Sequence, residues 1–483
     1  MKKTRCFLAF LFFMTMLLGL FQFSDPSVAL ADAATKRLST NYTIVNLGTS
    51  TANVTASYFE QDGTAWSGSN FTNFQLAPGA NSVVRQYFDT GLTSGQGSVV
   101  LSSDQPVAAV VQQLARNQAP SEAAYTAIGA PSSIYYVPFV SRHGGSAGGT
   151  ANSQIVIQNT SNGIPIDVVV EVTARPPSTV KYVKTISQIQ PFSSYSYDLE
   201  LQAELGENFW GSAKVSTSTA NGTLAVMTNM FSGSDSLIAY NGFPQGNTTW
   251  FIPYLYVRLG NSLTTSIILQ NIGDTAIPVN DIQMSCVKDP SSPGVNFTVP
   301  NDSDIPVNGA YGFNTLTDTA RFSQEGWYGG CKLISASGKQ FVTVIQYRKT
   351  ANKGMSAYEA VPGSLTSSQV TIPLIAKRLA NGFATSVAIQ NLGSTDAIVK
   401  LVYTPEGGGQ QVVRTNIVIP AKGSIQRNFR LADTEGPEIP DGWVGSLSIT
   451  SDGSSHPLAA FVGNWKFDES VGDTMQAYLG FNH

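Results

Sequence analysis

The residues of this 483-residue sequence that could do chemistry are few and scattered. Its three histidines, His143, His456 and His483, stand far apart and mark no serine- or cysteine-based catalytic motif. The sequence contains no G-x-S-x-G elbow, no H-E-x-x-H zinc pair and no P-loop. We therefore predict no catalytic residue, no metal ligand and no cofactor, and a protein that is not an enzyme.

The cysteines favour a structural role. Cys286 and Cys331 are the two that remain once a predicted N-terminal leader is removed. An even number of cysteines in an exported chain indicates a disulfide. A free thiol or a metal site is the alternative, but no histidine or second cysteine pair stands near them in the sequence. We expect a Cys286–Cys331 bridge.

The leader explains why export is expected. Basic residues at positions 2, 3 and 5 precede an apolar run over residues 6–23, and Ala29-Leu30-Ala31 has the A-x-A cleavage pattern. We predict a signal peptide over residues 1–31 and a secreted, extracellular protein of the cell surface. The alternative is an uncleaved anchor, because the apolar run would span about 27 Å as a helix. Asp25-Pro26 favours cleavage.

Composition argues against two classes of partner. Charged residues make up 12% of the chain, and its net charge is −4. The basic residues are not clustered densely enough to contact a phosphate backbone, so we expect no nucleic-acid partner. No second apolar run approaches 20 residues, so we expect no membrane span after signal cleavage.

The clearest organisation is a fourfold repeat. Its landmark is an asparagine two positions after an isoleucine or leucine, and successive copies are 113, 112 and 120 positions apart. Each copy closes on Ala-Tyr, and three carry a tryptophan just before a glycine. The structural landmarks are Asn46, Asn159, Asn271, Asn391, Trp210, Trp327, Trp443, Tyr125, Tyr240, Tyr358 and Tyr478. A repeat of this length is a domain, and we place the four copies at 32–134, 135–249, 250–369 and 370–483.

The local pattern within each copy predicts strands. Val54, Ala56 and Tyr58 alternate with Thr55 and Ser57, and Val399, Leu401 and Tyr403 of the fourth copy alternate with Lys400 and Val402. Turn pairs such as Asp62-Gly63 separate these runs. Seven or eight short strands in about 114 residues are typical of an immunoglobulin-like sandwich.

The chain thus resembles the tandem immunoglobulin-like β-sandwich repeats of bacterial surface and adhesion-related proteins. The resemblance implies an all-β fold of four tandem immunoglobulin-like sandwiches. It transfers no functional residue. Short linkers join the copies, and a strand of eight residues is about 26 Å long, so we expect a rod or articulated string of roughly 100–160 Å.

The first copy lacks a segment that the others share. Copies two to four open with an apolar strand containing Pro138, Pro253 or Pro373, whereas the first copy starts almost directly at its asparagine phrase. We expect an open sheet edge near Leu38, Tyr42 and Ile44. Residues 32–38 or solvent could cover it, leaving a monomer, or a neighbouring subunit could add a strand there.

Two functions remain in view. The first is a self-assembling subunit of an extracellular filament, sheath or surface layer, whose partners are further copies or other cell-surface components. The second is an adhesin or glycan-binding array. Burial of the recurring tryptophans would favour the scaffold role, and their exposure would favour glycan binding.

Overall fold

The computed structural model describes residues 38–115, 121–144, 150–178, 180–233, 236–260, 263–350, 354–365, 367–432, 438–452, 456–466 and 473–483. The predicted signal peptide, residues 1–31, lies outside the described residues. Within the described part of the chain, no helix is long and apolar enough to cross a membrane.

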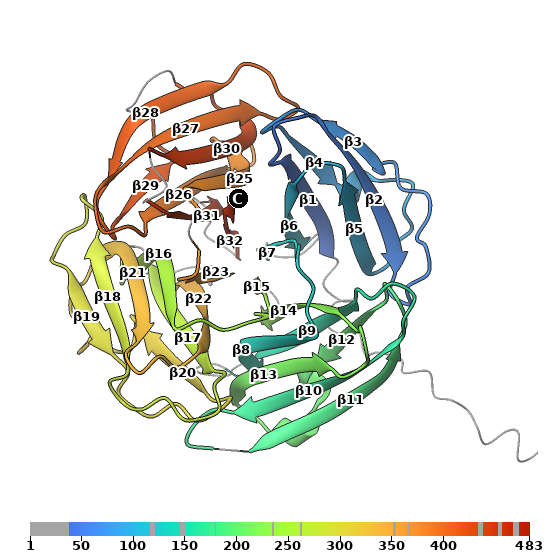
Figure 1. The fold of residues 1–483 in the computed structure, drawn as a ribbon, viewed down its shortest axis with the longest axis vertical. Helices are drawn as coiled ribbons and strands as arrows, with labels where there is room; N and C mark the ends of the chain where they lie inside the picture. Colours follow the sequence, from blue (N-terminus) through green and yellow to red (C-terminus); the bar gives the residue numbers. More distant parts are fainter. Residues whose placement is uncertain are drawn as a thin grey trace, which may run out of the picture. The chain divides into compact units, whose positions relative to one another are not determined.

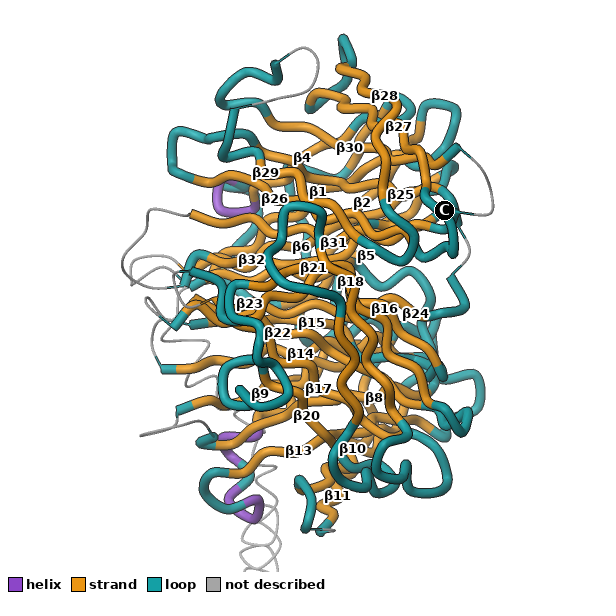
Figure 2. Tube along the Cα trace, turned by 90° about the vertical axis from the view of Figure 1, so that its left-hand side faces the viewer, coloured by secondary structure: helices purple, strands orange, loops and turns teal. Residues whose placement is uncertain are grey.

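The described chain is almost entirely antiparallel β-structure, which confirms the predicted fold class (Figure 2). Its strands alternate as predicted: in β2 (Ala52–Glu60) every second side chain from Ala52 to Tyr58 is buried. The helical elements are short 3-10 turns, η1 (Gln86–Phe88), η2 (Leu199–Leu201) and η3 (Ala203–Leu205). The strands form eight sheets, two for each repeat.

The first sandwich pairs a four-stranded sheet, β4-β1-β6-β7, with a three-stranded one, β3-β2-β5. Besides β2, its strands are β1 (Leu38–Asn46), β3 (Asn73–Leu76), β4 (Asn81–Arg85), β5 (Gly97–Ser103), β6 (Val107–Ala115) and β7 (Glu122–Thr126).

The second sandwich has two four-stranded sheets, β11-β10-β13-β8 and β12-β9-β14-β15. Its strands are β8 (Ile134–Arg142), β9 (Ala151–Asn159), β10 (Ile166–Ala174), β11 (Lys181–Ile189), β12 (Ser194–Asp198), β13 (Phe209–Thr217), β14 (Leu224–Ser232) and β15 (Leu237–Asn241).

The third and fourth sandwiches repeat this plan, each with a short fifth strand: β19-β18-β21-β16-β24 with β20-β17-β22-β23, and β28-β27-β30-β25-β33 with β29-β26-β31-β32. The third consists of β16 (Thr249–Val257), β17 (Leu263–Asn271), β18 (Ile282–Lys288), β19 (Phe297–Pro300), β20 (Ala310–Asn314), β21 (Trp327–Ser335), β22 (Phe341–Lys349), β23 (Gly354–Glu359) and β24 (Val361–Pro362). The fourth consists of β25 (Gln369–Ala376), β26 (Phe383–Asn391), β27 (Ala397–Pro405), β28 (Val412–Ile419), β29 (Ser424–Asn428), β30 (Val444–Ser451), β31 (Leu458–Lys466), β32 (Met475–Leu479) and β33 (Phe481–Asn482).

The strand order differs from that of an immunoglobulin constant domain. In that domain the first two strands share a sheet. In the second sandwich the first strand, β8, pairs with the sixth, β13, whereas the second strand, β9, pairs with the seventh, β14, in the opposite sheet. The β-sandwich architecture is as predicted, with its own connectivity.

The proline strands β8, β16 and β25, which we call the leading strands, carry a bulge at their proline. In β8, Pro138 and Phe139 together face Ser212 of β13, because the pairing shifts by one residue there. Proline has no N–H for the ladder, so a bulge is where a paired strand tolerates it. The pairing of β16 and of β25 shifts at the same place.

The sandwiches contact one another in a closed cycle, which can be followed in Figure 1. The leading strand of one sandwich packs on the asparagine-bearing strand of the next: β8 on β17, β16 on β26, and β25 on β1. The last pair joins the fourth sandwich to the first. Residues Leu38–His483 therefore form one compact unit.

Equivalent hydrogen bonds join three of the four neighbouring pairs. The hydroxyls of Ser98, Ser212 and Ser446 each donate to a backbone carbonyl in the turn before a strand of the following sandwich. The acceptors are the carbonyls of Phe192, Asn308 and Gly79. The bond from Ser446 to Gly79 closes the cycle, so the expectation of a rod or string is wrong. Alternation within strands predicts what each sandwich buries, but not which sandwich surfaces meet.

The four strands that end the repeats, β7, β15, β23 and β32, pack on one another cyclically and are called the inner strands here (Figure 1). Asp473 joins three of the sandwiches there, because its carboxylate accepts N–H bonds from Leu237, Met355 and Met475. Burial raises the pKa of Asp473 well above its ordinary value, and the three N–H bonds oppose this. Nothing in the sequence marks this residue, because a single aspartate among polar residues forms no motif.

Candidate functional site: the open edge of the first sandwich

The four recurring asparagines tie the two sheets of each sandwich together. Asn271 is fully buried; its amide donates to the carbonyls of Thr275 and Ile305, both at 2.9 Å, and its side-chain oxygen accepts from Gly273 N–H at 2.9 Å. Asn46, Asn159 and Asn391 are also buried and make the corresponding three contacts. These contacts give each asparagine a structural role in its sandwich.

Three of the recurring tyrosines hydrogen-bond to the backbone at the bulge of a leading strand. The hydroxyl of Tyr358 donates to the carbonyl of Tyr254 at 3.1 Å, and that of Tyr478 to Leu374 at 2.7 Å. Tyr240 donates to Phe139 in the same way. Each acceptor residue directly follows the bulge proline. It has no paired residue in the ladder between the leading strand and its neighbour. Tyr125 occupies this place in the first sandwich, where burial raises its pKa to about 12.

The three tryptophans are not equivalent. Trp327 and Trp443 stand two residues before the strand glycine, whereas Trp210 stands one residue before it. A shift of one residue turns a side chain to the opposite face of a strand. Trp327 is fully buried in its sandwich, whereas Trp210 and Trp443 are partly buried and pack against the core of theirs. Trp210 also lines a cleft toward the third sandwich.

The predicted disulfide is confirmed. Cys286 of β18 and Cys331 of β21 face each other directly across the antiparallel pair, with their Cα atoms 4.1 Å apart. The bridge lies within one sheet of the third sandwich and links two neighbouring strands.

The predicted assembly edge is misplaced. Leu38, Tyr42 and Ile44 lie in β1, which is an interior strand paired with β4 on one side and β6 on the other. Tyr42 and Ile44 are buried. The missing leading strand would belong to the other sheet, so its absence cannot open an edge at β1.

The open edge is instead at β5. This strand pairs with β2 on one side, and in the described part of the chain no strand pairs with its other side. The corresponding strands β13, β21 and β30 each pair with a leading strand at this position. An unpaired strand presents free N–H and C=O groups that can bind an added strand.

The core beside this edge is incompletely covered. Val99 and Leu101 of β5 are half-buried. Their counterparts are covered almost completely: Ala213 and Val215 in the second sandwich are 1% and 0% exposed. Cys331, Leu333, Leu447 and Ile449 occupy the same positions in the other two sandwiches and are equally buried. The difference follows from the missing leading strand, which covers this row elsewhere.

The neighbouring sandwich is uncovered at the same place. Val156 and Gln158 of β9 are half-buried, whereas Ile268 and Gln270 at the equivalent positions of β17 are 6% and 0% exposed. The amide of Gln270 donates to the carbonyl of Ala213 at 3.1 Å, whereas the Gln158 Nε2 atom, itself buried, has no hydrogen-bond partner among the described residues. By analogy with β8, which pairs with β13 and packs on β17, a leading strand of the first sandwich would pair with β5 and pack on β9, and the described residues contain no such strand. No charged residue lies in β5 itself.

The described residues hold no group of three His, Cys, Asp or Glu side chains placed to bind a metal ion. The histidines lie apart, His143 against Glu207 at 2.7 Å, His456 against Thr395 and His483 against Thr371. The sequence matches no protein-family model and no curated protein.

Proposed function

We propose that this chain is an exported, non-enzymatic structural protein of the cell surface that assembles by accepting an extended strand at the open edge of β5. The observation that carries the proposal is the incomplete burial of Val99 and Leu101 in the one sandwich whose described residues include no leading strand. A further copy of the chain is the proposed donor, which would make a filament or layer.

The three leading strands indicate what this position accepts. Each is an extended segment of eight or nine residues with a central proline and apolar residues on both sides. An added strand there would form a ladder with β5 and cover β9, two interactions that every other neighbouring pair already has. Binding of the donor segment would be stabilised by about 25 cal/mol for each Å² of apolar surface that it buries.

The first test is strand capture. A labelled peptide with the sequence of Ile134–Arg142 is titrated into the chain that starts at Asp32, and fluorescence anisotropy reports binding. We expect saturable binding that weakens at least tenfold in Val99→Lys, because a charge would be buried against the donor. Ser102→Lys, on the exposed side of β5, is the matched control. A peptide with aspartate in place of Val137 and Val140 should not bind.

The second test is assembly itself. Electron microscopy and light-scattering mass are followed as the concentration of the same chain is raised. We expect filaments or sheets that Val99→Lys abolishes and Ser102→Lys retains. Monomers at every concentration, together with no capture of the peptide, would refute the proposal.

A further inference from the structure

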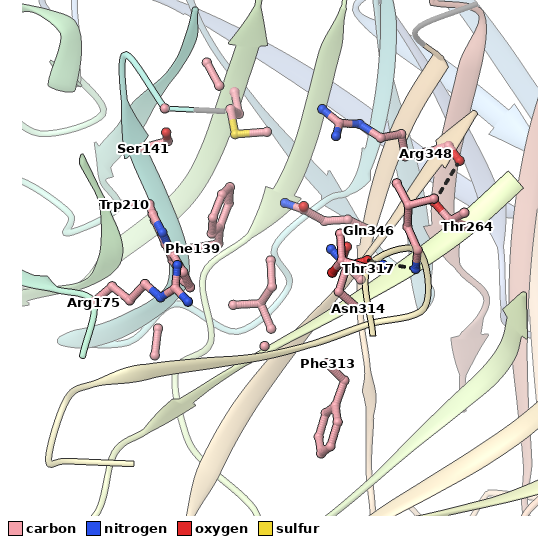
Figure 3. Close-up of a pocket in the computed structure, with 18 of the residues that line it drawn as sticks. Phe139, Ser141, Arg175, Trp210, Thr264, Phe313, Asn314, Thr317, Gln346 and Arg348 are labelled. Carbon is pink, nitrogen blue, oxygen red and sulfur yellow. Dashed lines mark hydrogen bonds between the residues drawn. The ribbon is translucent and has the colours of Figure 1, made fainter. Parts of the chain in front are cut away.

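A large cleft lies between the second and third sandwiches. Its volume is about 1120 Å³, at or above the roughly 300–1,000 Å³ of typical small-molecule sites. Figure 3 shows Phe139, Trp210 and Arg175 reaching it from the second sandwich, and Gln346, Asn314 and Arg348 from the third.

The same place between the third and fourth sandwiches is nearly filled. Ser141 N–H donates to Ser153 at 3.0 Å, and Tyr256 N–H donates to Thr265 at 2.9 Å, so Ser141 and Tyr256 hold the same position in consecutive sandwiches. The pocket beside Tyr256 measures about 140 Å³.

Three exchanges account for the difference between the two volumes. The strand registers align Ser141 with Tyr256, Gly312 with Gln426, and Arg348 with Trp465. Beside the fourth sandwich, the Tyr256 hydroxyl accepts from Gln426 at 3.0 Å and its ring lies 6.4 Å from that of Trp465. Two large side chains are replaced by serine and glycine in the wide cleft, and the third by an exposed arginine. The hollow is therefore built by side chains at one of four similar interfaces.

Positive charge predominates on the cleft wall. Its charged residues are Arg175, Arg321, Arg348 and Lys349 against Asp302 and Asp304. Arg321 already binds Asp302 and Asp318, whereas Arg348 is exposed and forms no ion pair with any described residue. This local excess of cations contrasts with the net charge of −4 of the chain.

The opposite wall supplies flat surfaces. The Arg175 guanidinium stacks 3.9 Å from the centre of the Trp210 ring, and Phe139 lies 6.1 Å from that ring. Side-chain amides and hydroxyls of Asn314, Thr317 and Ser266 complete the lining. Flat apolar surfaces next to hydroxyl and amide groups suit the two faces and the rim of a sugar ring.

We propose that this cleft binds an acidic oligosaccharide, with a uronate carboxylate paired to Arg348 and a sugar ring packed beside Phe139 and Trp210. The proposal goes beyond strand acceptance and does not depend on it, because the cleft lies between the second and third sandwiches, whereas the proposed strand position lies between the first and second. Guanidinium–carboxylate pairs are bidentate and directional, which would select charged over neutral saccharides.

The test is calorimetric titration of the chain that starts at Asp32 with tetragalacturonate, and with maltotetraose as the neutral probe. We expect the acidic tetramer to bind and the neutral one to bind at least tenfold more weakly. Arg348→Ala should weaken acidic binding about tenfold or more. Raising the salt from 50 to 500 mM should weaken it as well.

Gly312→Gln is the second variant, because it restores the residue of the filled interface. A Cβ at Gly312 would meet only the Ile267 carbonyl, at 3.9 Å, so the fold has room for it. It should abolish binding by occupying the cleft. Lys184→Ala removes a cation from β11, outside the cleft, and should change nothing. No acidic binding at millimolar concentration, equal binding of both tetramers, or binding indifferent to both cleft variants would overturn the proposal.

Discussion

Single buried polar residues hold this molecule together at points where its sheets and sandwiches meet. The recurring asparagines were predictable as structural, because one residue type returned at one place in all four copies. The more distant partner was not predictable, since one of the two carbonyls bound by Asn46 and by Asn159 lies about 30 positions away in the other sheet. Asp473 is the opposite case, a single residue with no repeat to mark it.

Replacing one recurring asparagine should be costly. In Asn271→Ala, the buried carbonyl of Ile305 and the partly buried hydrogen bond to the Thr275 carbonyl lose their donor. An unsatisfied buried polar group costs about 1–3 kcal/mol, so we expect the free energy of unfolding to fall by about 2–4 kcal/mol. Urea unfolding measures it. Asn296→Ala, at an exposed site, is the control, and an equal loss in both variants would contradict the assigned role.

Asp473 should make stability depend on pH. Burial raises its pKa in the folded state, as it does for Glu359, so folded chains hold protons that unfolded chains release above a pKa of about 4. The unfolded state then binds fewer protons, and stability falls as pH rises from about 4 through the raised pKa. We expect a higher urea midpoint at pH 5 than at pH 8.

Asp473→Asn tests the source of this dependence, since asparagine does not titrate. The decrease in urea midpoint between pH 5 and pH 8 should shrink in this variant. Glu60→Gln, which removes an exposed carboxylate, should leave it unchanged. The same decrease in Asp473→Asn as in the parent protein would show that other groups cause it.

At the scale of strands, alternation predicted the buried rows well, as β2 shows. The leading strands show where such a prediction ends. In β16 eight of nine residues are buried, because one face meets its own sandwich and the other meets β26. Composition marks such a strand as apolar but does not say what covers its second face. The same ambiguity placed the open edge at β1 rather than β5, since the sequence did not show which sheet the missing strand joins.

The disulfide links two paired strands, and its contribution to stability can be measured by removing it. It closes a loop of 45 residues, for which chain entropy gives roughly 4 kcal/mol. We expect Cys286→Ala/Cys331→Ala to lower the free energy of unfolding by about 3–4 kcal/mol, and a reductant to do the same to the parent protein. Calorimetry with and without reductant measures both. A double variant as stable as the parent would show that the bridge contributes nothing beyond packing.

At the scale of the molecule, the four sandwiches close into a cycle and do not form the predicted extended string. One buried cluster runs through the second and third sandwiches into the fourth, and another joins the fourth to Val110 and Ala124 of the first. Contacts this continuous make the sandwiches depend on one another. The repeat and its period were visible in the sequence, but the closing contact joins residues more than 350 positions apart.

Closure predicts both size and cooperativity. A compact chain of this length has a radius of gyration of about 22 Å, whereas a string of 100–160 Å would give roughly 30 Å or more. We expect small-angle scattering of the monomer near the lower value, and one calorimetric unfolding transition. Ser446→Lys, which places a charge against the Gly79 turn, should raise the radius of gyration. Four separate transitions would contradict closure.

The central claim is that the first sandwich has a vacant strand position, and amide hydrogen exchange along β5 tests it most directly. In the monomer that starts at Asp32, we predict fast exchange at every second amide of β5, slow exchange throughout β13, β21 and β30, and protection of β5 when the Ile134–Arg142 peptide is added. Full protection of β5 in the isolated monomer would contradict the claim, because it would mean that the chain already fills the position itself.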